Sequence, residues 1–206
     1  MLQLSTIDSS TLELLKKLMT FKEFAGMRLV GGTALALQIG HRKSIDLDFF
    51  GNIDFENIYT ADTFKNFKKV LTLKFSKNIN IFSIDNVKVD FVNYTYPWLQ
   101  NEILIDGIRL AGIQDIAAMK LAAVTGRGSR KDFIDIYFLL QNYNLRQLMD
   151  FYNNKYYDGS EYMVLKSLTY FDDAEEDYSV DMIKKISWAK AKKFILDAVD
   201  IYNKEL

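Results

Sequence analysis

The sequence predicts an α+β protein, with a mixed β-sheet and helices in the first half and helices in the second half. The first observation is a strand–helix–strand pattern over residues 28–50, where two glycines separate the first strand from the helix. The second is a pair of alternating apolar segments, residues 78–84 and 87–94, joined by an Asp-Asn turn signal. The third is a change near residue 113, after which apolar residues recur at helical spacing.

The composition is that of a globular protein and excludes several functional classes. Hydrophobic residues make up 49% of the 206 residues, which is ample for a buried core. The chain has no cysteine, which excludes disulfides and zinc–thiolate sites. His41 is its only histidine, which makes a Ser-His-Asp triad a poor hypothesis. The 26 basic and 27 acidic residues nearly balance, which argues against a uniformly basic nucleic-acid binder.

Nothing in the sequence points to a membrane or to export. No stretch approaches the roughly 20 apolar residues of a membrane span. The first ten residues lack the basic start and apolar run of a signal peptide. We therefore expect a cytoplasmic protein with no membrane partner.

The first half is expected to alternate helices and strands. Apolar residues recur every three or four positions from Leu12 to Phe21, which predicts an opening helix. Asp62 is placed to cap a second helix over residues 63–74, where apolar side chains have the same spacing. The other expected elements are a strand at 28–30, a helix at 33–39, a strand at 44–50, strands at 78–84 and 87–94, and short pieces at 103–105 and 108–110.

The second half is expected to be a separate helical domain of residues 113–206, after a first domain of residues 1–112. No Pro-, Gly- or Ser-rich linker separates the two, which predicts a packed junction. A lysine cluster precedes and enters the last helix. We favour a solvated helix face over RNA contact for this cluster of Lys184, Lys185, Lys190, Lys192 and Lys193.

Lys120 is the one charged residue between Asp115 and Arg127. Its neighbours at helical spacing are apolar, so its ammonium group leaves an apolar surface. A buried lysine without a partner is unfavourable, so Lys120 either reaches water or meets an anion. A triphosphate is one such anion.

Three polar residues surround the start of the next helix. Ser129 is placed to cap it, Asp132 lies in its first turn, where negative charge is favoured, and Asp135 lies deeper. Lys131 and Asp135 are four residues apart, so an ordinary surface salt bridge explains both without any function. The pattern leaves Asp132 and Asp135 open between a structural and a functional role.

The strongest functional signal lies in residues 29–50, which read LVGGTALALQIGHRKSIDLDFF. Gly31 and Gly32 lie just before a helix, where glycine allows positive φ and close approach of a ligand. The first N–H groups of that helix then point outward as an anion site. Asp46 and Asp48 are two residues apart on the next strand, so their carboxylates share one face. A phosphate cradle beside two carboxylates is what metal-dependent transfer from a nucleoside triphosphate requires.

A third carboxylate is predicted from the alternation of the later strand. The strand at 44–50 is expected to turn Ile45, Leu47 and Phe49 toward the core. Residues 87–91 alternate in the same way and leave Asp90 on the face opposite their apolar side chains. If the two strands are neighbours, their separation of about 4.8 Å brings all three carboxylates around one or two cations.

Three further residues lie near the acidic pair. Arg42 and Ser44 are close enough in sequence to contact phosphate, although both also fit an ordinary loop. His41 is not needed as a base, because metal ions carry most of the charge stabilisation in phosphoryl-type transfer.

These residues resemble a known family. Gly-Gly-Thr-Ala-Leu from Gly31, followed by Arg42-x-Ser44-x-Asp46-x-Asp48-Phe, resembles the signature of the polymerase-β-type nucleotidyltransferase superfamily. Within it the chain is most similar to the AbiEii/AbiGii toxin family of type IV toxin–antitoxin and phage-abortive systems. The later motifs Lys120-Leu-Ala-Ala and Lys131-Asp132-x-x-Asp135-Ile-Tyr-Phe-Leu also resemble that family.

The resemblance implies a polymerase-β-like mixed-sheet catalytic domain and a helical domain that closes the nucleotide cleft. It implies Mg²⁺ or Mn²⁺ as cofactor, a nucleoside triphosphate as substrate, RNA such as the 3′ end of tRNA as acceptor, and an antitoxin partner. The metal ligands implied are Asp46 and Asp48, with Asp90 added by superfamily analogy. Residues implied at the nucleotide are Gly31, Gly32, Thr33, Arg42, Ser44, Lys120 and Asp132. The residues implied in catalysis are Asp46, Asp48, Lys120 and Asp135.

Two alternatives stay open. One is a non-catalytic module that keeps the fold and works through protein contacts, although a structural role would not call for two adjacent carboxylates that repel. The other is a nucleotidyltransferase whose acceptor is a small molecule or a protein hydroxyl.

Overall fold

The computed structural model of the chain describes residues 1–55, 62–177 and 180–205. The chain forms two compact units. The first contains Met1–Tyr96 and Asn101–Ala111, and the second contains Pro97–Gln100 and Gly112–Leu206.

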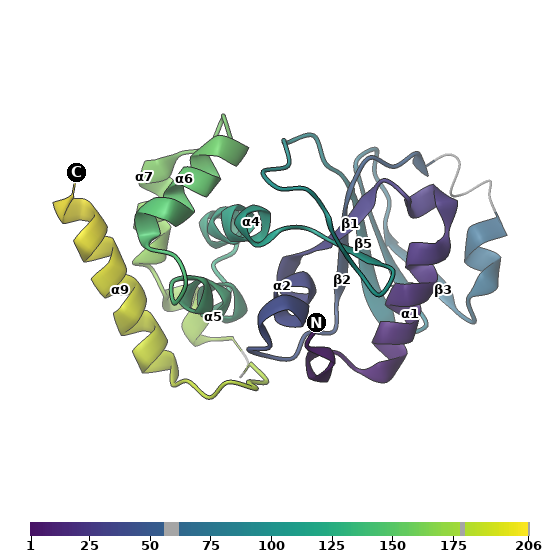
Figure 1. The fold of residues 1–206 in the computed structure, drawn as a ribbon, viewed down its shortest axis with the longest axis horizontal. Helices are drawn as coiled ribbons and strands as arrows, with labels where there is room; N and C mark the ends of the chain where they lie inside the picture. The colour runs from purple at the N-terminus through teal and green to yellow at the C-terminus, as the bar shows by residue number, and fades with distance from the viewer. Residues whose placement is uncertain (56–61, 178–179, 206) are drawn as a thin grey trace. The chain divides into compact units, whose positions relative to one another are not determined.

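The first unit is a mixed β-sheet with helices, and the predicted α+β class is confirmed (Figure 1). Its described elements, in chain order, are η1 (Leu4–Thr6), α1 (Ser9–Thr20), η2 (Lys22–Phe24), β1 (Met27–Val30), α2 (Gly31–Ile39), β2 (Leu47–Gly51), η3 (Asp62–Asn66), β3 (Val70–Lys74), β4 (Ile79–Ile84), β5 (Val87–Asn93), β6 (Ile103–Ile105) and β7 (Ile108–Leu110).

The strands form one sheet in the order β3-β4-β5-β2-β1-β7-β6. Strands joined by short hairpins pair antiparallel: β3 with β4, β4 with β5, and β6 with β7. β1 also pairs antiparallel with β2, whereas β2 with β5 and β1 with β7 are parallel. Parallel neighbours need long crossover connections, and this topology places β5 directly beside β2.

The core lies on one face of the two central strands. Leu47, Phe49, Val89 and Phe91 are at most 1% exposed, and they alternate with half-buried residues along β2 and β5. The Phe91 ring stacks on Phe49 at 5.3 Å and on Phe24 at 4.6 Å between centroids. This face is therefore closed by hydrophobic packing, and the half-buried residues between these positions occupy the other face.

Ile45 departs from the predicted alternation. It is 60% exposed, because β2 begins only at Leu47 and Ile45 belongs to the preceding segment. The alternation of core-facing apolar residues begins at Leu47.

The predicted helix over residues 63–74 is wrong beyond its first turn. A 3-10 helix ends at Asn66, and Val70–Lys74 forms β3, which pairs antiparallel with β4. The stretch Val-Leu-Thr-Leu is rich in residues that favour strands, and pairing with a neighbouring strand outweighs the helical spacing seen in the sequence.

The predicted hairpin between β4 and β5 is confirmed. Asp85 and Asn86 have φ values of 49° and 70°, the left-handed conformation that a two-residue type I′ turn requires at both positions. The turn fixes the register of β5, and with it the face on which Asp90 lies.

The second unit is helical, as predicted. Its described helices are α4 (Ile113–Gly126), α5 (Arg130–Leu139), α6 (Leu145–Lys155), α7 (Glu161–Leu168), α8 (Asp172–Glu175) and α9 (Trp188–Lys204). Helix α4 contacts α5, α6 and α7, and its buried side chains include Ile116, Leu121 and Val124.

A buried ion pair explains why residues 97–100 belong to the second unit. Lys155 and Asp115 are both fully buried, with 2.7 Å between Nζ and Oδ1. Lys155 also donates to the carbonyl oxygen of Pro97 at 2.7 Å. Asp115 accepts the backbone N–H groups of Leu99 and Gln100 at 2.9 and 3.0 Å. No local pattern in the sequence predicts this pair, because its members lie forty residues apart.

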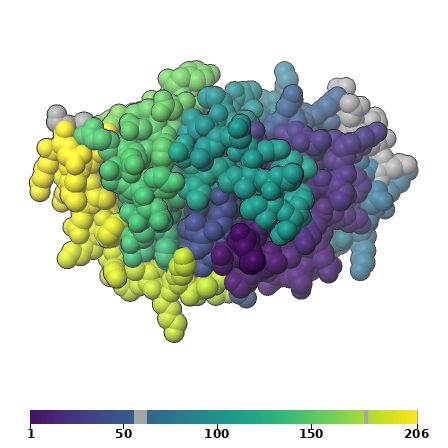
Figure 2. Space-filling model, in the orientation of Figure 1, coloured from purple at the N-terminus to yellow at the C-terminus, as the bar shows by residue number. Residues whose placement is uncertain are grey.

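Helix α9 lies at the surface of the second unit (yellow in Figure 2). Its buried stripe includes Ala191, Ile195 and Tyr202, as the spacing predicts. Of the lysine cluster, Lys192 pairs with Glu175, and the other four lysines are exposed. A role for this cluster in RNA binding stays untested.

Among the helices that the structure describes, none is both long and apolar enough to cross a membrane.

Candidate active site

The glycine bend brings the start of α2 against a carboxylate of β2. Gly31 has φ of 69°, and a Cβ atom built there would lie 3.2 Å from Asp48 Cγ and would overlap Oδ2. Any side chain at this position would therefore collide with Asp48. Helix α2 starts at Gly31 with no side-chain cap and no acidic residue in its first turn. Its first N–H groups thus form an anion-binding end beside Asp48.

The second glycine is contacted by the segment that follows α2. A Cβ atom on Gly32 would overlap the guanidinium group of Arg42 and lie 3.4 Å from Ser44 Oγ. Arg42 is only 4% exposed and donates to the carbonyl oxygen of Lys43 at 3.0 Å. The structure therefore gathers Gly32, Arg42 and Ser44, each of which the sequence marked as a candidate for phosphate contact.

Thr33 fixes this segment to the helix. Its Oγ1 is hydrogen-bonded to Ser44 Oγ at 2.9 Å and also donates to the carbonyl oxygen of Asp46. Thr33 is 1% exposed, so its hydroxyl group positions Ser44 and Asp46.

Two of the three predicted carboxylates, Asp48 and Asp90, lie on neighbouring strands, and Asp46 lies just before β2. In the parallel pairing of β2 with β5, Asp48 is the register partner of Asp90. Asp46 lies two residues before Asp48, and all three residues are half-buried. Adjacent strands are about 4.8 Å apart, so the carboxylates of Asp48 and Asp90 emerge side by side.

Lys88 is a residue of this site that the sequence reasoning missed. It precedes Asp90 by two positions on β5, so both side chains share a face, and its Nζ lies 2.8 Å from both Asp90 oxygens. Burial alone would lower the pKa of Lys88, but the hydrogen bond and charge of Asp90, with Asp48 and Asp46, raise it. The alternation that identified Asp90 would also have identified Lys88, had cations been sought on the same face.

The oxygen atoms of these three carboxylates are of the type that binds a hard divalent cation. Carboxylate oxygens are the ligands that Mg²⁺ prefers. Apart from its ion pair with Lys88, the buried Oδ1 atom of Asp90 has no hydrogen-bond partner within the part of the chain that the structure describes. However, no three acidic or histidine side chains among the described residues already stand at metal-binding spacing. The roles of Asp46, Asp48 and Asp90 as metal ligands therefore stay predictions, with Lys88 standing at the third carboxylate.

His41 is fully buried, so the structure does not present it to a substrate.

The predicted residues of the second unit form a buried charged network. Lys120 is 3% exposed, and its Nζ lies 2.9 Å from Asp132 Oδ1 and 2.7 Å from Asp135 Oδ2. Arg127 donates to both oxygens of Asp132, and Ser129 donates to Oδ2 at 2.6 Å. Lys120 thus pairs with two carboxylates inside its own unit, so its buried charge does not need a phosphate as partner.

Two expectations for this segment are wrong. Lys131 is exposed while Asp135 is fully buried and paired with Lys120, so the predicted surface pair of Lys131 with Asp135 does not describe Asp135. Ser129 occupies the N-cap position of α5 but makes no capping hydrogen bond, and its hydroxyl group donates to Asp132 instead.

The charges of this network strongly shift the pKa of one carboxyl group, that of Asp132. Burial alone would raise the pKa of Asp132, but the hydrogen bonds from Arg127 and the charge of Lys120 outweigh it. They hold the pKa well below its usual range.

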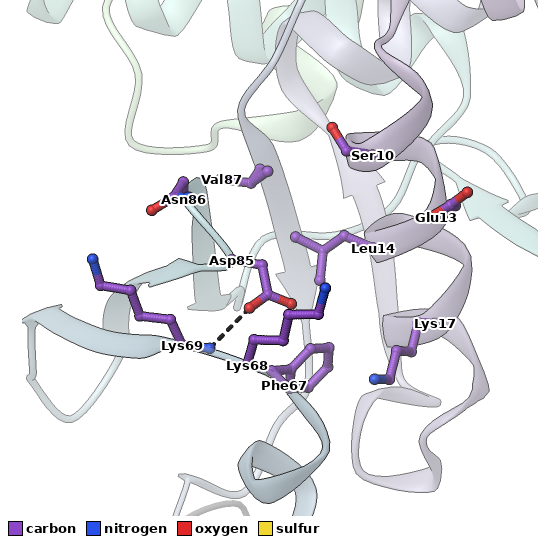
Figure 3. Close-up of a pocket in the computed structure, with 10 residues that line it drawn as sticks. All are labelled: Ser10, Glu13, Leu14, Lys17, Phe67, Lys68, Lys69, Asp85, Asn86 and Val87. Atoms are coloured by element: carbon purple, nitrogen blue, oxygen red, sulfur yellow. Dashed lines mark hydrogen bonds between the residues drawn. The ribbon is translucent and has the colours of Figure 1, made fainter.

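A cavity of about 460 Å³ lies elsewhere in the first unit (Figure 3). It is lined by α1, by residues 67–69 and by the β4–β5 turn, and Val87 in its wall alternates with Lys88 along β5. The cavity therefore opens on the core side of β5, away from Asp90. It contains both lysines and acidic residues, and we assign it no part in the carboxylate site.

Comparison with known proteins gives a family and a fold. The family model described as "Nucleotidyl transferase AbiEii toxin, Type IV TA system" matches residues 13–200. The chain is 35% identical over 196 residues to the uncharacterized protein aq_aa25 of Aquifex aeolicus strain VF5, across 92% of this chain and 94% of the relative.

Two solved structures share the fold. JHP933 from Helicobacter pylori has a TM-score of 0.59 at 19% identity, covering 97% of this chain and 94% of that one. MenT4, a nucleotidyltransferase toxin from Mycobacterium tuberculosis H37Rv, has a TM-score of 0.60 at 15% identity, covering 90% and 79%.

Proposed function

The chain belongs to the AbiEii nucleotidyl transferase toxin family, and we propose that it transfers a nucleoside monophosphate to a hydroxyl group of RNA, at the 3′ end of tRNA. The family makes the chain a nucleotidyltransferase of the toxin class and implies a nucleoside triphosphate as substrate. The acceptor, the cation and the residue roles are our proposal.

The observation that carries the proposal is the meeting of Gly31 with Asp48. The helix end that can bind phosphate and the carboxylates that can bind a cation lie side by side within one unit. A triphosphate complexed with a divalent cation carries both complementary groups, so one ligand satisfies both halves of the site.

In this proposal Asp46 and Asp48 hold Mg²⁺ or Mn²⁺, with Asp90 as third ligand. The N–H groups at Gly31–Thr33 receive the triphosphate oxygens, and Arg42 and Ser44 support the same side. A bound divalent cation would neutralise the triphosphate and favour ionisation of the acceptor hydroxyl group.

The reaction is a displacement at the α-phosphorus. The acceptor oxygen bonds to that phosphorus, the bond from it to the oxygen bridging the β-phosphate breaks, and pyrophosphate leaves. The hydroxyl proton passes to solvent. The site contributes mainly by positioning the reactants and stabilising charge, as in other phosphoryl-type transfers.

Lys120, Asp132 and Asp135 enter the proposal on the family resemblance alone. The resemblance places Lys120 and Asp132 at the nucleotide and Asp135 in catalysis. The ion pairs described above orient the ammonium group of Lys120, and whether it then contacts phosphate is for mutation to decide.

The direct test follows labelled nucleotide into its acceptor. The protein is incubated with each α-labelled nucleoside triphosphate, Mg²⁺ or Mn²⁺, and total RNA, and products are separated before and after nuclease treatment. We expect nuclease-sensitive label in the tRNA size range. Label on protein or on a small molecule would overturn RNA as acceptor, and triphosphate binding without any transfer would count against the reaction.

Asp48→Asn, with Asp106→Asn as control, ties transfer to the carboxylate site. Asp106 is exposed in the β6–β7 turn, and its positive φ of 52° suits asparagine. Both variants lose one carboxylate charge, but only Asp48→Asn should lose transfer. Expression in a host should show the same contrast, with growth inhibition lost in Asp48→Asn and relieved by the antitoxin protein.

A further inference from the structure

Lys88 is placed where a cation of the carboxylate site would be. Its ammonium nitrogen is 2.8 Å from both oxygens of Asp90. Asp90 is the register partner of Asp48, and Lys88 precedes it on the same face of β5. Lys88 therefore pairs with the carboxylate that adjoins Asp48 in the sheet.

The ammonium group of Lys88 can leave Asp90 without a large rearrangement of the site. The side chain of Lys88 is 43% exposed, whereas that of Asp90 is 18% exposed. Lys88 can therefore swing its charge into water on a flexible stem, while Asp90 stays in place. Asp90 Oδ1 is buried, and apart from its ion pair with Lys88 it has no hydrogen-bond partner within the described chain.

We propose that Lys88 is a built-in substitute cation, which occupies Asp90 beside Asp48 until a divalent metal ion displaces it. Lys88 and the metal ion then compete for the same carboxylate. The ammonium group offsets carboxylate repulsion in the metal-free site, and it weakens metal binding by the same interaction. This inference rests on the proposed metal site.

Two measurable consequences follow from replacing Lys88 with methionine, which keeps most of the length of the stem and removes the charge. Without metal, Asp90 loses the ammonium group paired with it, so the melting temperature should fall. With metal, the competitor is gone, so Mn²⁺ affinity should rise by on the order of tenfold, the size of a modest coupling between two ligands. A purely structural lysine would give the first effect without the second.

The experiment is calorimetric titration of Mn²⁺ into the whole protein, with melting temperatures recorded with and without Mn²⁺. The variants are Lys88→Met, Lys88→Arg, which keeps the charge, and Lys16→Met as matched control. Lys16 is exposed on α1 and contributes the same change in net charge far from β5 in the sequence. Tighter binding in Lys88→Met alone, with Lys88→Arg no tighter than wild type, supports the proposal.

The outcomes separate this inference from the proposed function. If wild type binds Mn²⁺ and Asp48→Asn does not, while Lys88→Met binds equally or more weakly than wild type, the competition is refuted and the metal site stands. If Lys88→Met gains no more affinity than Lys16→Met, the effect is general charge, and the proposal is also refuted. If neither wild type nor Lys88→Met binds Mn²⁺, the metal site itself is wrong and the inference falls with it.

Discussion

The two charged clusters of this protein use the same kinds of side chain in different proportions. In the first unit, Asp46, Asp48 and Asp90 are half-buried, and Lys88 pairs with Asp90. In the second unit, the two carboxylates Asp132 and Asp135 meet Lys120 and Arg127, and both acids are fully buried. The acids of the first cluster lie at accessible positions, whereas the acids of the second are fully buried and are balanced by two cations.

This difference indicates which cluster is built for a ligand. Buried charges are tolerated only when they are paired, and the second cluster is paired in this way. Neighbouring carboxylates at accessible positions repel one another, and a cation bound among them would relieve that repulsion. The first cluster also lies beside an uncapped helix end at Gly31, which can receive an anion. We therefore expect mutations in the first cluster to affect mainly activity, and mutations in the second to affect mainly stability.

The largest effect should follow Asp48→Asn. The substitution keeps the size of the side chain and removes a charge from the proposed metal site. We expect nucleotide transfer to fall by about 10³-fold, the scale on which charge-stabilising groups act. The unfolding free energy should change by less than about 1 kcal/mol, because the position is half-buried. Transfer rates and denaturant unfolding measure the two. A large loss of stability with residual activity would reverse the assignment of the clusters.

Lys120→Met should show the opposite pattern. Removing the ammonium group leaves two buried carboxylates without their shared partner, which costs about 3–5 kcal/mol of unfolding free energy. Urea unfolding measures this loss, and Lys131→Met is the control, since Lys131 is exposed one residue before Asp132. Adding Asp135→Asn to Lys120→Met should restore part of the stability. A stable Lys120→Met protein that binds triphosphate poorly would instead make Lys120 a phosphate ligand.

The two clusters also differ in how far sequence reasoning could reach them. The glycine bend and the acidic pair were identifiable because their spacing is local, and the face of Asp90 followed from strand alternation. The pairing of β2 with β5, which makes Asp90 a neighbour of Asp48, depends on a long-range crossover that no local pattern encodes. From the sequence, the closeness of Asp90 to Asp48 could be predicted only on the condition that these two strands pair.

The errors have the same origin. The apolar helix surface around Lys120 was predicted correctly, but its partners Asp132 and Asp135 come from the following helix, which only tertiary folding brings near. The helical spacing over residues 63–74 was overridden by pairing of β3 with β4. Tertiary pairing, not local propensity, decided each case.

The balanced cluster should also reveal itself through pH. Because the pKa of Asp132 is held well below its usual range, the unfolded chain takes up a proton at this residue before the folded protein does. The stabilisation is complete above about pH 5 and declines as the pH falls from there toward the folded pKa. We expect Asp132 to contribute about 1 kcal/mol less at pH 3 than at pH 7. The measurement is the difference in unfolding free energy between wild type and Asp132→Asn at both pH values, and a pH-independent difference would contradict the ion pairing.

The sharpest test of the site should come from Gly31→Ala with Gly107→Ala as its pair. Both glycines have positive φ, at 69° and 78°, so alanine should cost each about 1–2 kcal/mol of unfolding free energy. At Gly107 a new Cβ atom meets nothing within 4 Å, whereas at Gly31 it meets the Asp48 carboxylate. The two variants have similar backbone strain, but only Gly31→Ala adds a contact with Asp48. Their comparison therefore measures the effect of that contact alone. Transfer assays should therefore show loss in Gly31→Ala and wild-type rates in Gly107→Ala. If both variants transfer equally well, the closeness of Gly31 to Asp48 is a matter of packing, and the helix end and the carboxylate do not share a ligand.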